Sequence, residues 1–421
     1  MKKTPKSLRL QIGLFGRTNI GKSSFLNLVA GQDVAITSSI PGTTTDVVEK
    51  PMELLPVGPV VFLDTAGIND VSMLCAKRID KTKKIFDRAD IFVLLVTPGC
   101  WGEFEESVVL EAKKHKAPLI IAINKIDVEF PDDTFINKVG AVTKNYFFVS
   151  SLDKKNRDTY INSFKELILK SCPEDFLKPS PLLGDLVSCE SLVVLIVPID
   201  LEAPKGRIIL PQVQVIRDLL DNKQAALVVK ESEYVSVLRK LKKPPDLVVC
   251  DSQVVDFMVA NTPVSVKCTT FSIVFSRYKG NLERAVQAAA RIDSLGDGDR
   301  VLIAESCSHH PIQDDIGRIK IPRWLKKYTG KNLCIESCAG RDFPRDLAEF
   351  KLVIHCGGCM ITRREMLFRI QKALEEKVPM TNYGVAIACL KGVLPRVLEP
   401  FAAELESFKN INLQSKEKKN G

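Results

Sequence analysis

Cysteine and histidine gather near the C-terminal end of this chain. The segment 355–359 reads His-Cys-Gly-Gly-Cys, and Cys307 and His309 stand earlier, separated by one residue. Glycine permits the backbone bend that lets the two thiols of such a turn converge on one centre. Thiolates and imidazoles are ligands of zinc and of iron–sulfur centres. The pattern therefore predicts a metal site in the last third of the sequence.

Two kinds of metal centre fit this set of donors. Three thiolates with one histidine make an ordinary structural zinc site. The same thiolates with one weak or exchangeable position suit a [4Fe–4S] cluster. Spacing alone does not separate the two, and simple buried cysteines are a third, weaker interpretation. The candidate ligands are Cys307, Cys356, Cys359, His309 and His355.

A second chemical signature stands near the start of the chain. Residues 16–23 read Gly-Arg-Thr-Asn-Ile-Gly-Lys-Ser, between a predicted strand and a predicted helix. In such a loop the glycines let backbone N–H groups face phosphates, the lysine binds the β- and γ-phosphate oxygens, and the serine hydroxyl binds Mg²⁺. The predicted contacts to GTP and Mg²⁺ from this segment are Gly16, Asn19, Gly21, Lys22, Ser23 and Ser24.

Further motifs follow in the order of a guanine-nucleotide site. Asp64 ends an apolar run and would reach Mg²⁺ through water, while the N–H of Gly67 would contact the γ-phosphate. Residues 124–127 read Asn-Lys-Ile-Asp, and the last carboxylate can accept two hydrogen bonds from guanine that adenine cannot donate. The predicted base contacts are Asn124, Lys125, Asp127, Ser150 and Ser151.

These motifs resemble those of the translation-factor-like small GTPases, a group that includes tRNA-modifying and ribosome-assembly GTPases. Residues 41–46, Pro-Gly-Thr-Thr-Thr-Asp, are similar to the group's switch I, although Thr45 replaces the usual arginine. Asn19 stands where potassium-activated members help to bind K⁺, and Ile68 stands where many GTPases carry a water-orienting glutamine. The resemblance implies a slow GTPase that uses Mg²⁺ and K⁺, with Asn19, Lys22, Thr44, Asp64 and Gly67 as catalytic residues.

Short β-branched strands alternate with helical segments along the chain, which predicts an α/β fold. A proline-bearing segment at 177–181 breaks this rhythm and is typical of a linker. We predict a P-loop GTPase domain at 1–176, further α/β domains at 184–267 and 268–410, and a frayed polar tail at 411–421. The predicted strands are Leu8–Phe15, Val60–Asp64, Ile91–Thr97, Leu119–Asn124, Tyr146–Ser150, Ser191–Pro198, Ala225–Val229, Leu247–Cys250, Arg300–Ala304, Leu333–Glu336 and Leu352–Ile354.

Composition narrows the classes of function. The net charge is +9, but basic and acidic residues are interleaved, so we expect no nucleic-acid surface. No apolar run reaches the length of a membrane span, and twelve cysteines beside a nucleotide motif favour reduced thiols. We expect a soluble, cytoplasmic protein. The alternative, an RNA-associated GTPase with a structural zinc site, is hinted at only by Trp324 among basic neighbours.

From about residue 8 to 405 the chain resembles the [FeFe]-hydrogenase maturation GTPases. The resemblance rests on the Cys-x-His and His-Cys-x-x-Cys segments and on residues 198–207, 210–212, 216–221, 275–280, 342–344 and 381–384. It implies a GTPase domain, a dimerisation domain that makes a homodimer, and a last domain in which Cys307, Cys356 and Cys359 bind a [4Fe–4S] cluster.

The same resemblance implies a role and its partners. Such a protein is a scaffold or carrier on which a transient diiron subcluster is finished and delivered to apo-[FeFe]-hydrogenase. Two radical-SAM maturases would supply the precursor. A carrier needs an exchangeable fourth position on its cluster, and the resemblance offers His309 and His355 for it.

Overall fold

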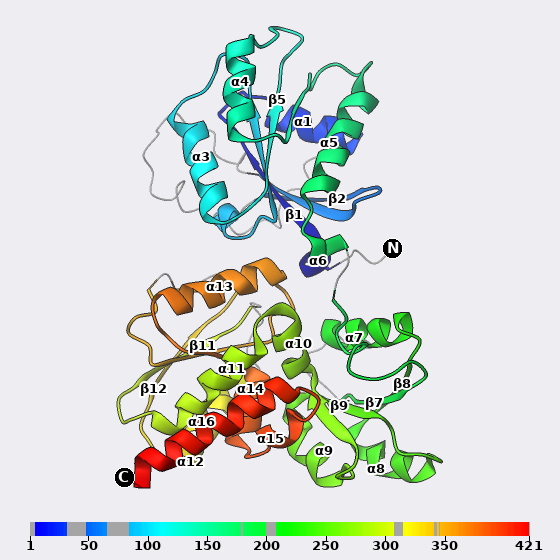
Figure 1. Ribbon diagram of the computed structural model, residues 1–421, viewed down its shortest axis with the longest axis vertical. Helices are drawn as coiled ribbons and strands as arrows, with labels where there is room; N and C mark the ends of the chain where they lie inside the picture. Colours follow the sequence, from blue (N-terminus) through cyan, green and yellow to red (C-terminus); the bar gives the residue numbers. More distant parts are fainter. Residues whose placement is uncertain are drawn as a thin grey trace. The chain divides into compact units, whose positions relative to one another are not determined.

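The computed structural model describes residues 5–31, 48–64, 84–177, 180–198, 208–306, 315–340, 343–344 and 346–420. The chain divides into two compact units, Met1–Pro179 and Ser180–Gly421 (Figure 1). The break falls within the segment predicted as a linker.

The first unit is built on a six-stranded sheet in the order β2-β3-β1-β4-β5-β6. Strand β2 runs antiparallel to β3, and the other pairs are parallel. Every residue of β4 is buried, because a parallel strand covered on both faces needs apolar side chains throughout. The bounds are β1 (Leu10–Phe15), β2 (Val48–Leu54), β3 (Gly58–Asp64), β4 (Ile91–Val96), β5 (Leu119–Ile123) and β6 (Tyr146–Phe148).

Helices cover both faces of this sheet (Figure 1). On one face, Phe25 of α1 and Phe164 of α5 pack with Ile12 and Val93. On the other, side chains of α3 and α4 pack with alternate residues of the same strands. The bounds are η1 (Lys6–Leu8), α1 (Lys22–Ala30), α3 (Glu103–Lys114), α4 (Asp133–Val142), α5 (Arg157–Ser171) and α6 (Glu174–Leu177). The predicted α/β fold of this domain is confirmed.

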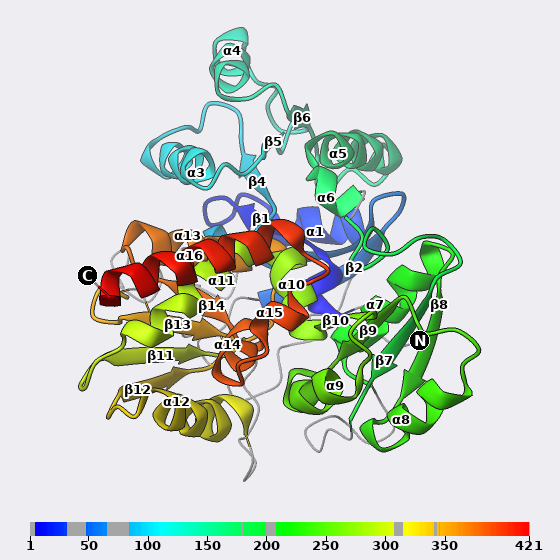
Figure 2. The same ribbon diagram turned by 60° about the horizontal axis from the view of Figure 1, so that its bottom comes forward.

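The second unit contains two parallel four-stranded sheets, in the orders β10-β9-β7-β8 and β12-β11-β13-β14 (Figure 2). The first sheet comprises β7 (Leu192–Ile196), β8 (Ala225–Val229), β9 (Leu247–Cys250) and β10 (Lys267–Thr270). The second comprises β11 (Arg300–Ala304), β12 (Cys334–Cys338), β13 (Leu352–His355) and β14 (Met380–Asn382). Strand β10 crosses the domain boundary expected at 267/268 and belongs to the first of these sheets.

One hydrophobic core joins the two sheets of this unit. It includes Val194 in the first sheet, Leu219 on α7, and Ile303 and Ile354 in the second sheet. The opposite face of the second sheet has its own small core, which includes Leu302, because successive side chains of a strand point to opposite faces. The two halves of the second unit therefore share one continuous hydrophobic core.

The helices of the second unit complete its layers. Side chains of α11, α12 and α14 belong to the shared core, whereas Ala373 of α13 packs on the opposite face of the second sheet. The polar segment 411–420, expected to be frayed, continues α16 because it lacks proline and glycine and is rich in helix-forming residues.

The bounds are α7 (Leu210–Asp221), α8 (Glu231–Lys240), η2 (Ser252–Val254), α9 (Val255–Asn261), α10 (Phe271–Lys279), α11 (Leu282–Ala289), η3 (Ala290–Ser294), the π-helix η4 (Ile316–Lys320), α12 (Ile321–Thr329), α13 (Arg363–Glu375), α14 (Tyr383–Leu390), α15 (Leu394–Val397) and α16 (Ala402–Asn420). Within the described ranges, no helix is long and apolar enough to cross a membrane.

The shared core predicts that the second unit unfolds as one body. Leu219 is 0% exposed on α7, so Leu219→Ala should lower the free energy of unfolding by about 2–5 kcal/mol. Trp324 reports from the half of the unit that holds the second sheet, and Trp101→Phe removes the other tryptophan. In that background the denaturant midpoint of Trp324 fluorescence should fall. Leu220→Ala, at a site 55% exposed, is the matched control. An unchanged midpoint in Leu219→Ala would show that the two sheets unfold separately.

Candidate functional site

The loop after β1 has the shape of a phosphate-binding loop. Gly21 caps α1 with φ 97°, and a Cβ there would lie 2.4 Å from Asn124 Nδ2, so only glycine fits. Lys22 Nζ donates hydrogen bonds to the carbonyls of Gly16 (2.7 Å) and Arg17 (2.8 Å). Ser23 is exposed and Ser24 is half-buried at the first turn of the helix. The predicted phosphate contacts therefore come together around the N-terminus of α1.

Asn124 joins three of the predicted nucleotide motifs. Its buried side chain donates from Nδ2 to the carbonyl of Ile20 (2.8 Å) in the phosphate loop. Its Oδ1 accepts hydrogen bonds from the Ser151 backbone N–H (3.0 Å) and the Ser151 hydroxyl (2.8 Å). Ser150, beside it, is also buried. One amide side chain thus ties the end of β5 to the loop after β6 and to the loop after β1.

The remaining described base contacts lie at the surface. Lys125 has φ 63° and its Nζ donates to the Asn19 carbonyl (2.9 Å), while Asn19 itself has φ 62°. Asn19, Lys125 and Asp127 are all exposed. A planar base could therefore reach the Asp127 carboxylate from solvent. The neighbouring loops are held in place by the hydrogen bonds of Asn124.

The predicted magnesium ligands are only partly described. Asp64 is buried at the end of β3, opposite Leu14 of β1, and Lys50 Nζ lies 3.7 Å from its Oδ2. Thr44 and Gly67 lie outside the described residues. Asp64 is thus one strand away from the loop that carries Lys22.

An ion pair that the motifs did not reveal holds the phosphate loop to α3. Arg17 donates to both carboxylate oxygens of Glu105, from Nε (2.8 Å) and Nη2 (2.6 Å). Glu105 is 1% exposed and also accepts from the Gly102 N–H (2.9 Å). Burial alone would raise the pKa of Glu105, but the hydrogen bonds from Arg17 and Gly102 outweigh it and lower that pKa below its ordinary value. No local sequence pattern indicates this pair, because its two residues are 88 positions apart in the sequence.

The pair predicts a pH-dependent contribution to stability. Because the folded-state pKa of Glu105 is lowered, its contribution is present above the unfolded-state pKa and is lost as pH falls through the folded-state pKa. Glu105→Gln should therefore destabilise the first unit at pH 7 by about 1–3 kcal/mol. The difference should begin to shrink as the pH falls below the unfolded-state pKa of about 4.3, and it should vanish only below the lowered folded-state pKa. Trp101 fluorescence in a Trp324→Phe background reports this unit. The exposed neighbour gives the control, Glu106→Gln, and an equal loss of stability in that variant would contradict a specific role for the pair.

In the second unit, the ends of β11 and β13 lie side by side next to two of the predicted metal ligands, His355 and Cys356. Ala304 lies opposite His355, and the Cys356 N–H donates to the Ala304 carbonyl (2.8 Å). The Ser306 N–H then donates to Cys356 Sγ (3.1 Å), and Cys356 Sγ lies 3.3 Å from Ser306 Oγ. Ser306 directly precedes Cys307, and Cys307 and His309 lie outside the described residues. Within the described ranges, no three His, Cys, Asp or Glu side chains form a metal-binding group.

The turn between Cys356 and Cys359 is held by a buried lysine. Lys279, 2% exposed at the end of α10, donates from Nζ to the carbonyls of Gly358 (2.7 Å) and Ile361 (2.8 Å). Burial lowers the pKa of Lys279 to about 8, an effect opposed by Cys359 and Cys356. Burial and the neighbouring Cys356 raise the pKa of Cys359, and Lys279 opposes that rise. The ammonium group thus contacts the same turn that carries the two thiols.

His355 is tied into the protein through both ring nitrogens. Arg369 Nη1 donates to His355 Nε2 (3.0 Å), so the proton is on Nδ1, which donates to the Cys356 carbonyl (2.7 Å). Arg369 also bonds Glu365 and the Gly340 carbonyl. Burial, and then the charge of Arg369, lower the pKa of His355 to about 3. This predicted ligand is therefore neutral, and binding a metal would require breaking one of these bonds.

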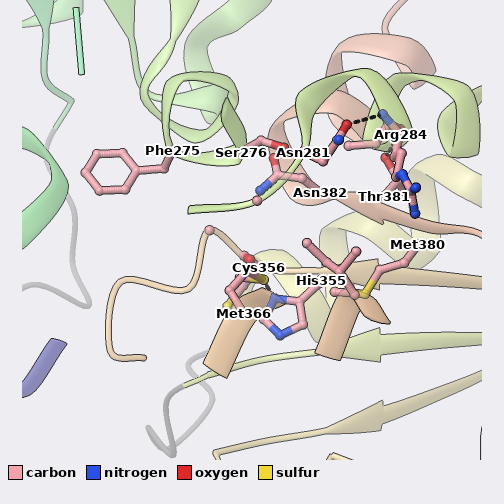
Figure 3. A pocket seen from close by; sticks show the side chains of 14 residues that line it. Phe275, Ser276, Asn281, Arg284, His355, Cys356, Met366, Met380, Thr381 and Asn382 are labelled. Carbon is pink, nitrogen blue, oxygen red and sulfur yellow. Dashed lines mark hydrogen bonds between the residues drawn. The ribbon is translucent and has the colours of Figure 1, made fainter. Parts of the chain in front are cut away.

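A pocket lies beside this turn (Figure 3). Its cavity volume is about 30 Å³, and His355, Cys356 and Met366 form one side of it. Asn382 and Arg284 lie on the other side. The structure thus adds Lys279 and Arg369 to the surroundings of the cysteines. Of these, Lys279 stands in the segment 275–280, on which the family resemblance partly rests.

The fold and these two groups of residues define a P-loop GTPase domain joined to a second α/β unit with paired thiols. Three family models match the chain and agree with this description. Residues 11–125 match the 50S ribosome-binding GTPase, residues 182–280 the hydrogen maturase F dimerization domain and residues 283–400 the hydrogen maturase F tetramerization domain. The chain belongs to the hydrogen maturase F family, the hydrogenase maturation GTPases. The predicted resemblance is confirmed.

Curated relatives share only part of the chain. The tRNA modification GTPase MnmE of Prochlorococcus marinus (strain NATL1A) is 32% identical over 166 residues, which are 39% of this chain and 34% of that protein. MnmE of Synechococcus sp. (strain JA-2-3B'a(2-13)) is 36% identical over 124 residues, 29% of this chain and 27% of that protein. This chain therefore spans about a third of the relatives it matches, within the GTPase domain.

Among solved structures, Era in complex with MgGDPNP and a fragment of 16S ribosomal RNA has a TM-score of 0.32 and 21% identity, covering 54% of this chain and 97% of that one. A likeness this weak has no bearing on function.

Proposed function

We propose that this maturase holds a [4Fe–4S] cluster in its second unit and carries the diiron subcluster to apo-[FeFe]-hydrogenase. GTP bound by the first unit would control its affinity for partners. Two radical-SAM maturases would supply the precursor, and the protein would work as a cytoplasmic homodimer. The observation that supports cluster binding is the pair of thiols, Cys356 and Cys359, that follows β13. Ser306, the residue before Cys307, contacts the thiol of Cys356.

Cys307, Cys356 and Cys359 would hold the cluster. Ser306 contacts Cys356 Sγ through both its N–H and its hydroxyl, so the residue joined to Cys307 already touches the second proposed ligand. An N–H donated to sulfur favours the thiolate form that binds iron. When bound, such a cluster supplies one exchangeable coordination position at which a diiron cargo can attach.

The residues behind the turn keep its shape. Arg369 and the Cys356 carbonyl occupy both nitrogens of His355, so His355 orients the turn in the described arrangement. His309 remains the other candidate for the fourth position. A fourth position without a strong protein ligand is what a carrier requires, because the cargo must leave again.

In the first unit, the proposed chemistry is hydrolysis of GTP with Mg²⁺. Lys22, Ser23 and Asp64 would bind the phosphates and the metal ion, and Asp127 would select guanine. Asn19 would help to bind K⁺, whose positive charge replaces that of an arginine finger. Ile68 cannot orient water, so turnover should be slow. Hydrolysis would change how the domain docks on its partners, as in other nucleotide switches.

The potassium role predicts a cation-dependent rate. GTP hydrolysis should be faster in KCl than in NaCl by at least about tenfold, because the positive charge stabilises the transition state. Asn19→Ala should bring the rate in KCl close to the rate in NaCl without unfolding the domain. The exposed loop neighbour provides the control, Thr18→Ala, which should keep the response. If the unsubstituted protein hydrolysed GTP at equal rates in the two salts, the proposed potassium site would be contradicted.

Cluster binding predicts a selective effect of cysteine substitution. After anaerobic reconstitution with ferrous iron and sulfide, Cys356→Ala and Cys359→Ala should lose the cluster and the ability to activate apo-hydrogenase, because each removes one of few thiolates. Cys334 is exposed at the first residue of β12, the far end of that strand from the site, and Cys334→Ala should retain both. If Cys359→Ala kept the iron content of the unsubstituted protein and activated apo-hydrogenase equally well, the proposed ligand set would be contradicted.

A further inference from the structure

Lys279 is a buried cation whose partners are unusual. Its side chain is almost wholly enclosed, and its Nζ lies 5.9 Å from the centre of the Phe275 ring. Among the described residues, no carboxylate lies within ion-pair distance of this Nζ; its hydrogen bonds go to the carbonyls of Gly358 and Ile361. Burying an ammonium group without a carboxylate partner is costly. An anion at the turn that these carbonyls belong to would offset that cost.

The two carbonyls belong to the segment that carries both described cysteines. Gly358 stands between Cys356 and Cys359 with φ 65°, and a Cβ there would lie 2.5 Å from Met366 Cε. This backbone is therefore open to glycine alone, and its carbonyl direction is set by the turn. Lys279 Nζ donates hydrogen bonds to the carbonyl of Gly358, just before Cys359, and to the carbonyl of Ile361, two residues after it. It consequently fixes the backbone on both sides of Cys359.

We infer that Lys279 is a positioning residue for the cluster: it holds the turn that carries Cys356 and Cys359, and its buried charge makes the cluster easier to reduce. This inference rests on the proposed cluster. A [4Fe–4S] core held by three thiolates is anionic and gains a further negative charge on reduction. A fixed positive charge beside it, shielded from solvent, stabilises the reduced state more than the oxidised state.

Two substitutions separate the charge of Lys279 from its hydrogen bonds. Lys279→Met keeps most of the apolar stem and removes both the charge and the hydrogen bonds. Lys279→Gln removes the charge but keeps an N–H donor, on a side chain one atom shorter. Lys391→Met is the matched control. Lys391 follows α14, about 12 Å of helix from Tyr383 at its start, and its charge is paired with Asp256. Removing that distant charge should leave the cluster unaffected.

The test is a redox titration of the reconstituted full chain, followed by the paramagnetic signal of the reduced cluster. At a fixed potential, the ratio of reduced to oxidised cluster should fall at least tenfold in Lys279→Gln and Lys279→Met. For a one-electron couple, this is a shift of about 59 mV to lower potential. Lys391→Met should titrate like the unsubstituted protein.

Other results decide against the inference. An unchanged potential in a Lys279 variant that keeps its cluster would overturn it. Folded variants that both lack iron would overturn the proposed effect of the charge on reduction, because Lys279 would then act only by holding the turn. Circular dichroism of each variant shows whether it folds. Iron missing from the unsubstituted protein as well would remove the proposed function, and this inference with it.

Discussion

The parallel pairing of β11 with β13 brings Ser306 and Cys356 together at the carboxyl ends of the two strands. Ala304 lies opposite His355, and the next residues along each strand touch through Ser306 and Cys356. Residues 50 apart in sequence thereby become neighbours. The carboxyl ends of parallel strands are where open α/β sheets place their sites. Lys279 and Arg369 then fix the turn that follows β13 from two different helices.

The first unit has a similar, mostly parallel sheet, but a buried amide holds its site together. Its motifs also follow the carboxyl ends of neighbouring strands, and a single buried amide, that of Asn124, links three of them. Gly21 leaves room for that amide, since a Cβ there would overlap it. The nucleotide site and the thiol turn are therefore both built from strand ends that long-range contacts hold in place. Both depend on buried polar side chains that form hydrogen bonds with backbone groups.

Much of this arrangement follows from local sequence signals. Apolar runs bounded by glycine and polar residues placed β1, β4, β5, β11 and β13, and the motif order placed the nucleotide-binding loops. Contacts between distant segments left no such signal. Nothing near Glu105 indicates that Arg17 neutralises it, and nothing near His355 shows that Arg369 occupies its ring. Strand β10 was hidden for a similar reason, because Lys267–Thr270 is short and only its pairing with β9 makes it a strand.

The account as a whole depends on iron at the turn between Cys356 and Cys359. The most direct measurement is made on the unsubstituted full chain, purified without oxygen. Its iron, sulfide and zinc are determined, and its electron paramagnetic resonance spectrum is recorded before and after reduction. The account predicts iron and sulfide in equal amounts, with little zinc, and the signal of a reduced [4Fe–4S] cluster. Colourless protein with one zinc ion per chain and no such signal would contradict it.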